Sequence, residues 1–93
     1  MLRESGDRAE VSGAMNLAGA TTLLADGVAA ISRSVRVFDL AQVAEVDSSS
    51  LAVLFGWLRE AGRQGKSIQI VNPPKDMLSL AELYGVSDLL PLA

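Results

Sequence analysis

One acidic residue and three hydroxyl residues stand where an apolar, strand-like segment gives way to an amphipathic helix: Asp47, Ser48, Ser49 and Ser50. At the N-terminus of a helix the backbone N–H groups are unpaired, and negative charge is favoured there. Ser48 can therefore serve as a helix N-cap, as a contact for a partner protein, or as a phosphoacceptor. Asp47 can stabilise the helix start through the dipole, orient Ser48 or contact the same partner.

Other residue types that catalysis commonly uses are missing. The 93 residues include no cysteine and no histidine, which excludes disulfides, thiol nucleophiles, imidazole bases and the usual zinc sites. The chain has no phosphate-binding Gly-rich loop of the Walker type, and no lysine lies near Ser48 in sequence. We therefore expect a protein that is not an enzyme and that uses no cofactor and no metal.

Charge and hydropathy narrow the classes of partner. The formal net charge of −3 gives no attraction for a phosphate backbone, so nucleic-acid binding is not expected. Residues 1–8 are charged and do not form a signal peptide. The longest apolar stretch is far shorter than the roughly 20 residues of a membrane span. The chain is expected to be soluble and cytoplasmic.

Strand and helix patterns alternate along the chain. Apolar and β-branched residues predict a strand or a hairpin at 9–15 and strands at 34–40 and 67–71. Helical spacing predicts helices at 20–31 after a cap at Asn16, from 48 or 49 to 63, and at 72–84. The last of these should bury Met77, Leu80, Ala81 and Tyr84, and an apolar tail at 86–92 should pack back on the domain. The alternation predicts a single α/β domain over residues 1–93, a small mixed or parallel sheet with helices against it.

The predicted helix at 48–63 carries apolar residues on two sides. One stripe has i, i+3, i+4, i+7 spacing and should face the core: Leu51, Leu54, Phe55 and Leu58. Val53 and Trp57 lie roughly 130° from its centre, on the side of Ser49 and Ser50. They either widen the core stripe or form an exposed patch for a partner. In the second case Trp57 would be the anchor, because tryptophan is enriched at binding hot spots.

Residues 39–51 resemble the signature of STAS domains, a family that includes the anti-sigma-factor antagonists. That signature is a strand ending Asp-Leu, a short excursion, then an apolar residue, Asp, Ser or Thr, a small residue, Gly and Leu. The resemblance covers about 11–91, with its signature region at about 35–63, and implies the STAS fold with Ser48 at the acceptor position. Ser50 replaces a frequent Gly and Asn16 replaces an acid. Both departures weaken a phosphorylation switch more than a contact surface.

The C-terminal segment narrows the resemblance. Residues 80–86 and 89–91 resemble the STAS subunits of bacterial phospholipid ABC transporters, which maintain outer-membrane lipid asymmetry. The resemblance implies a regulatory subunit that binds the cytoplasmic ATPase subunit, in a complex with the permease, and that reaches the inner membrane only through that complex. The expected partner-binding residues are Asp47, Ser48, Ser49, Ser50, Val53 and Trp57. The alternative is an anti-sigma-factor antagonist switched by phosphorylation of Ser48.

Overall fold

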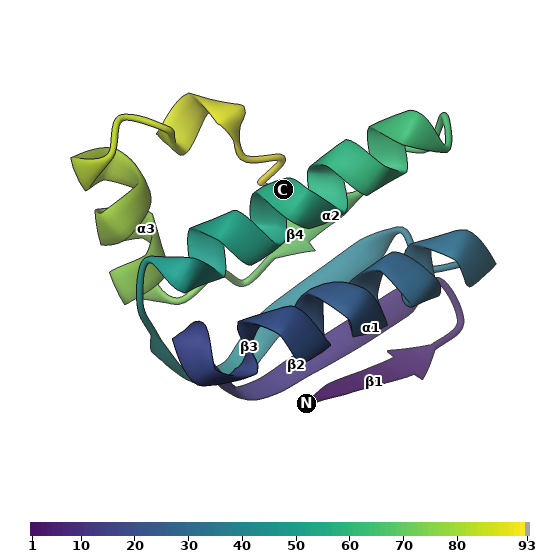
Figure 1. Ribbon diagram of the computed structural model, residues 1–93, viewed down its shortest axis with the longest axis horizontal. Helices are drawn as coiled ribbons and strands as arrows, with labels where there is room; N and C mark the ends of the chain where they lie inside the picture. Colours follow the sequence, from purple (N-terminus) through teal and green to yellow (C-terminus); the bar gives the residue numbers. More distant parts are fainter. Residues whose placement is uncertain (93) are drawn as a thin grey trace.

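The computed structural model describes residues 1–92, in which four strands form one sheet in the order β1-β2-β3-β4 (Figure 1). Their bounds are β1 Leu2–Ser5, β2 Arg8–Met15, β3 Val37–Val46 and β4 Gln69–Val71. β1 and β2 form an antiparallel hairpin, whereas β2 and β3, and β3 and β4, pair in parallel. Parallel neighbours need crossover connections, which here contain helices. The predicted α/β fold with a mixed sheet is confirmed.

The helices in this part of the chain are η1 Leu17–Gly19, α1 Ala20–Arg33, α2 Ser49–Arg63, α3 Lys75–Leu83 and η2 Ser87–Leu89, where η marks a short 3-10 helix. α1 and α2 lie side by side on one face of the sheet, and α3 lies beside the N-terminal half of α2 (Figure 1). Asn16 caps η1 as predicted, because its Oδ1 accepts the Gly19 N–H at 3.3 Å. No helix within residues 1–92 has the length and apolarity that crossing a bilayer requires.

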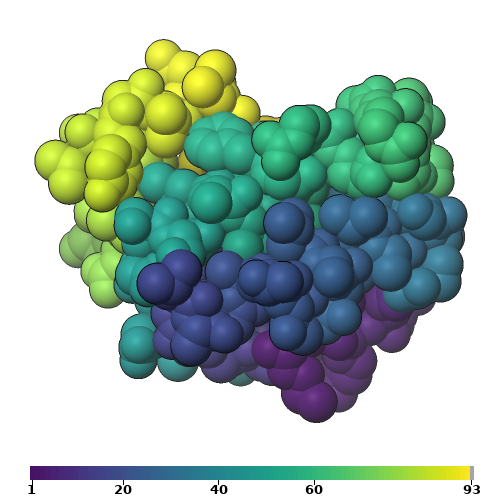
Figure 2. Space-filling view, viewed as in Figure 1, coloured from purple at the N-terminus to yellow at the C-terminus, as the bar shows by residue number. Residues whose placement is uncertain are grey.

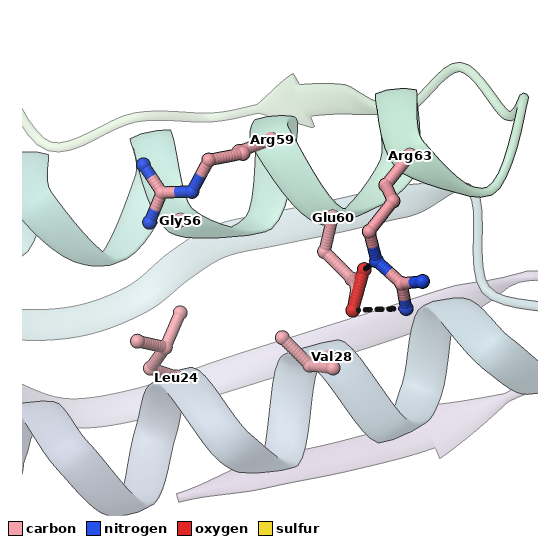
Figure 3. Close-up of a pocket in the computed structure, with 6 residues that line it drawn as sticks. All are labelled: Leu24, Val28, Gly56, Arg59, Glu60 and Arg63. Carbon is pink, nitrogen blue, oxygen red and sulfur yellow. Dashed lines mark hydrogen bonds and ion pairs between the residues drawn. The ribbon is translucent and has the colours of Figure 1, made fainter.

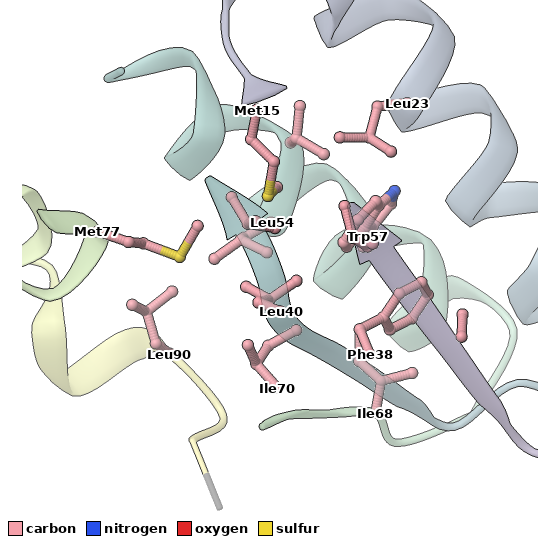
Figure 4. Close-up of a cluster of buried hydrophobic side chains, with 14 of the residues drawn as sticks. Met15, Leu23, Phe38, Leu40, Leu54, Trp57, Ile68, Ile70, Met77 and Leu90 are labelled. Atoms are coloured by element: carbon pink, nitrogen blue, oxygen red, sulfur yellow. The ribbon is translucent and has the colours of Figure 1, made fainter. Parts of the chain in front are cut away.

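The hydrophobic core lies between the sheet and the α1–α2 pair (Figure 4). Strand residues two apart point to the same face, and those that enter the core include Ala9, Val11, Phe38 and Leu40. Met77 of α3 and Leu90 of the C-terminal tail complete it. The tail docks as predicted, because Leu90 is buried and the Ile70 N–H donates to the Pro91 carbonyl at 2.9 Å.

All four strands differ from the prediction, β2 by only one residue at its start. β1 was not predicted, because its Arg3 and Glu4 are charged, as suits an exposed edge strand. β3 begins at Val37, three residues later than predicted, and continues past Leu40 to Val46, with a shift in its register against β2 between Glu10 and Ser12. β4 begins at Gln69, two residues later than predicted.

Candidate partner-binding site at the start of α2

Asp47 caps α2 and joins it to η1. Its Oδ1 accepts the Ser49 N–H at 2.8 Å, and its Oδ2 accepts the Leu17 N–H at 3.1 Å. The sheet brings these segments together, because Met15 and Val46 pair at the ends of the parallel strands β2 and β3. The N–H of Leu17, followed by that of Ser49, lowers the pKa of the Asp47 carboxyl below its usual range. Asp47 therefore holds the first turn of α2 in place.

Ser48 does not cap the helix. Its backbone already has helical angles, φ −63° and ψ −20°, and its side chain makes no capping hydrogen bond. Of the three roles open to Ser48, the structure does not bear out that of a side-chain N-cap, since the Asp47 carboxylate accepts the Ser49 N–H instead. Ser48 is exposed and Ser49 is half-buried. The Ser48 hydroxyl remains available to a partner or to a modifying enzyme.

Ser50, Val53 and Trp57 do not reach the surface. Their side chains are buried, with Trp57 fully enclosed. The Trp57 ring stacks on Phe38 at a centroid distance of 4.3 Å (Figure 4). Its Nε1 donates to the Leu24 carbonyl at 3.2 Å. The exposed-patch hypothesis is wrong for these residues, and the alternative of a wide core stripe is correct. The reason is that α1 packs along the side of α2 that a helical wheel alone leaves open.

The hydroxyl oxygen of Ser50 is buried and has no hydrogen-bond partner among residues 1–92. A buried hydroxyl that lacks a partner costs stability. We expect Ser50→Ala to raise the free energy of unfolding by about 1 kcal/mol, measured by urea denaturation. Ser79→Ala, at an exposed position of α3, is the control, because it measures the gain in stability that comes from helix propensity alone, at most about 0.5 kcal/mol. A Ser50→Ala variant no more stable than the Ser79→Ala variant would contradict the assignment.

A shallow apolar hollow lies beside Ser48. It has a volume of about 330 Å³ and is lined by Ser48, Leu51, Phe55, Tyr84 and Val86. In Figure 2 the teal N-terminal half of α2 lies between the dark blue start of α1 and the yellow-green α3 and η2. Tyr84 is 58% exposed, which contradicts its predicted burial, because α3 ends at Leu83 and Gly85 turns the chain at φ +70°. Sequence reasoning missed Tyr84 and Val86 as site residues.

A second hollow lies on the outer face of the helix layer, between α1 and α2 (Figure 3). Its volume is about 250 Å³, and it is lined by Leu24, Val28, Gly56, Arg59, Glu60 and Arg63. Arg63 pairs with Glu60 one turn before it on α2. Gly56 lies against Leu24, so the two helices approach closely here. None of the predicted site residues lines this hollow.

Asp39, the third residue of β3, has a structural role. Its Oδ1 accepts the Ala41 N–H at 2.9 Å and the Asn72 Nδ2–H at 3.1 Å, while its Oδ2 accepts from Arg8 at 3.0 Å. The Ala41 N–H, the Asn72 amide and Arg8, in that order, lower the pKa of the Asp39 carboxyl. The residue thus ties β2, β3 and the loop after β4 together.

The lowered pKa values of Asp39 and Asp47 predict an acid-sensitive fold. A carboxyl whose pKa is lower in the folded state stabilises the fold above its usual value near 3.8, and this contribution is lost as pH falls through the folded pKa. The free energy of unfolding should therefore fall below pH 4, as urea denaturation from pH 6 to pH 2.5 would measure. The Asp39→Asn variant should have a lower free energy of unfolding at pH 6, and this free energy should fall less steeply between pH 6 and pH 2.5. An unchanged slope in this variant would count against the assignment.

Comparison with known proteins identifies the family. A family model described as "Mlab, STAS domain" matches residues 2–91. The chain belongs to this STAS-domain family. The STAS domain is 34% identical over 58 residues to the intermembrane phospholipid transport system binding protein MlaB of Haemophilus influenzae (strain ATCC 51907 / DSM 11121 / KW20 / Rd). That match covers 62% of this chain and 55% of the relative, so it spans about half of the relative's length.

Solved structures share the fold of this STAS domain. A putative anti-sigma factor antagonist from Thermotoga maritima superposes with a TM-score of 0.77 at 15% identity, covering 99% of this chain and 83% of the other. An anti-sigma factor antagonist from Mycobacterium paratuberculosis gives 0.76 at 21% identity, covering 99% and 81%. At these identities the similarity establishes the STAS fold, and the predicted fold class is confirmed.

Proposed function

We propose that this STAS domain is a non-catalytic regulatory subunit that binds the cytoplasmic ATPase of a bacterial phospholipid ABC transporter. The family match and the similarity to the Haemophilus influenzae MlaB protein support phospholipid transport as the process. In this role the domain acts at the inner face of the inner membrane, through a complex with the ATPase and the permease. The complex would serve to maintain the lipid asymmetry of the outer membrane.

The main observation in support of a docking surface is the exposed Ser48 beside the apolar hollow. Ser48 has no capping role, and the half-exposed Tyr84 side chain stands across the hollow from the start of α2. Asp47 holds this turn of α2 against η1, so the surface is preorganised. A preorganised surface regulates an ATPase by binding one of its conformations better than another. The domain itself need do no chemistry.

Filling the hollow tests this surface. Ser48→Trp should weaken binding to the ATPase subunit at least tenfold, because an exposed indole at this position blocks the contact. The thermal midpoint should stay close to that of the parent protein, since Ser48 is exposed and caps nothing. Ser67→Trp, at another exposed serine, is the matched control and should bind normally. Equal affinities of both variants in a titration with the purified ATPase would refute the proposed surface.

The second candidate function is an anti-sigma-factor antagonist. The exposed Ser48 hydroxyl favours it, and the similar solved structures include proteins of that description. Affinity capture of the tagged protein from its own cells, with mass spectrometry of its partners and of Ser48, separates the two functions. An ABC ATPase with its permease and an unmodified Ser48 support the transporter subunit. A protein kinase and phosphate on Ser48 support the antagonist.

A further inference from the structure

The basic residues of the chain are distributed very unevenly. No lysine or arginine occurs at positions 9–32, 37–58 or 76–93. These stretches supply all of η1, β3 and η2, most of α1, the first ten residues of α2 and all of α3 except Lys75. Because the same elements surround Ser48, this end of the molecule is almost free of positive charge. The one cation on α3, Lys75, is at its first residue, about 12 Å along the helix from Leu83.

Most cations outside these stretches are engaged within the chain. Arg36 and Lys66 both donate to the Ile31 carbonyl near the C-terminus of α1, at 3.2 and 2.8 Å. Arg33 pairs with Glu4, Arg63 with Glu60, and Arg8 with Asp39. Cations near the last turn of a helix complement its dipole, so Arg36 and Lys66 stabilise the C-terminal end of α1.

Acidic residues remain unpaired at the Ser48 end. Glu45 near the end of β3, Glu82 in the last turn of α3 and Asp88 in η2 are all exposed, and none forms an ion pair within residues 1–92. Two large apolar side chains are also exposed, Leu83 in the last turn of α3 at 77% and Leu17 in η1 at 76%. Leu17 adjoins Asp47 through its N–H. The hollow beside Ser48 is therefore lined mostly by apolar side chains, and the elements around it carry exposed acids and few cations.

We infer that the hollow receives an apolar side chain from a partner segment that carries arginine or lysine beside it. This inference rests on the proposed function, and it specifies the chemistry of the ATPase surface that binds. An acidic partner segment would place like charges together, which costs affinity, whereas a basic one is steered toward the site. The occupant is thus a basic, amphipathic segment of a partner protein, docked between the start of α2 and the turn after α3.

The first test measures how charge controls binding of the ATPase subunit. The double variant Glu45→Gln with Glu82→Gln removes two exposed acids without touching the hollow. At low salt it should bind the ATPase roughly fivefold more weakly, mainly through slower association, and should depend less on salt than the parent protein. Asp7→Asn removes an exposed acid from the β1–β2 turn and should change neither quantity. A double variant that behaves like Asp7→Asn overturns the inference and leaves the proposed function intact.

The second test does not need the ATPase. The ¹⁵N-labelled protein is titrated with a helical peptide of leucine and arginine, and separately with one of leucine and glutamate. The arginine peptide should shift the amide signals of Ser48, Tyr84 and Val86, and the glutamate peptide should not. If the ATPase does not bind but the arginine peptide maps to these residues, the inference stands and the proposed partner is wrong. Equal shifts with both peptides, or shifts elsewhere, overturn the inference.

Discussion

Trp57→Ala is expected to lower the free energy of unfolding by about 3–5 kcal/mol. The indole is fully buried, stacks on Phe38 and donates its Nε1–H to the Leu24 carbonyl. Alanine would leave a cavity between the sheet and the two helices, and it would also remove that hydrogen bond. Small domains have a total stability of about 5–15 kcal/mol, so the variant should be close to unfolding. Guanidinium denaturation followed by circular dichroism measures the loss.

Trp57→Phe is the matched control for this prediction. Phenylalanine keeps an aromatic ring against Phe38 but loses the Nε1–H and part of the volume, so its loss should be well below that of alanine. A loss under about 1 kcal/mol for Trp57→Ala would contradict the burial on which the site assignment depends. Reduced partner binding by Trp57→Ala would then have to be separated from unfolding. The surface variant Ser48→Trp carries the binding test for that reason.

Gly27→Ala is expected to cost about 3 kcal/mol or more. A Cβ at Gly27 would lie 2.0 Å from Trp57 Nε1 and 2.2 Å from its Cε2. The indole cannot move aside, because it is stacked on Phe38 and bonded to Leu24. The gain in helix propensity from glycine to alanine, about 1 kcal/mol, is smaller than this clash. Thermal and chemical denaturation of the variant measure the net loss.

Two glycines of α2 provide controls for Gly27→Ala, which changes a residue of α1. A Cβ at Gly56 would meet the Cδ1 of Leu24 at 2.5 Å, but this is the flexible end of a half-buried side chain (Figure 3). A Cβ at Gly62 would meet nothing within 4 Å. Gly62→Ala should stabilise the domain by about 0.5–1 kcal/mol, and Gly56→Ala should fall between Gly62→Ala and Gly27→Ala. The same effect at all three positions would contradict the close contact at Gly27.

The fold and the position of the site could be predicted from local patterns. The stripe Leu51, Leu54, Phe55 and Leu58 predicted α2, and the boundary at Asp47 and Ser48 predicted where it begins. The alternation of strands and helices predicted the mixed α/β sheet. These features depend on residues close in sequence, whose periods of two and 3.6 residues report which face of an element is buried. The STAS resemblance rested on the same contiguous segment.

Contacts between segments that are distant in sequence determine which of the predicted site residues are exposed and which are buried. Trp57 is buried because α1 covers the flank of α2, with Gly27 leaving room for the indole. Asp47, and not Ser48, caps α2, and the pairing of β2 with β3 brings the Leu17 N–H to the other oxygen of its carboxylate. Tyr84 is exposed because α3 ends just before it. A helical wheel gives the direction of a side chain, but the sequence by itself does not give the number of neighbours in that direction. The sequence therefore determined the elements and the place of the site, and only the tertiary structure determined which of its side chains a partner can reach.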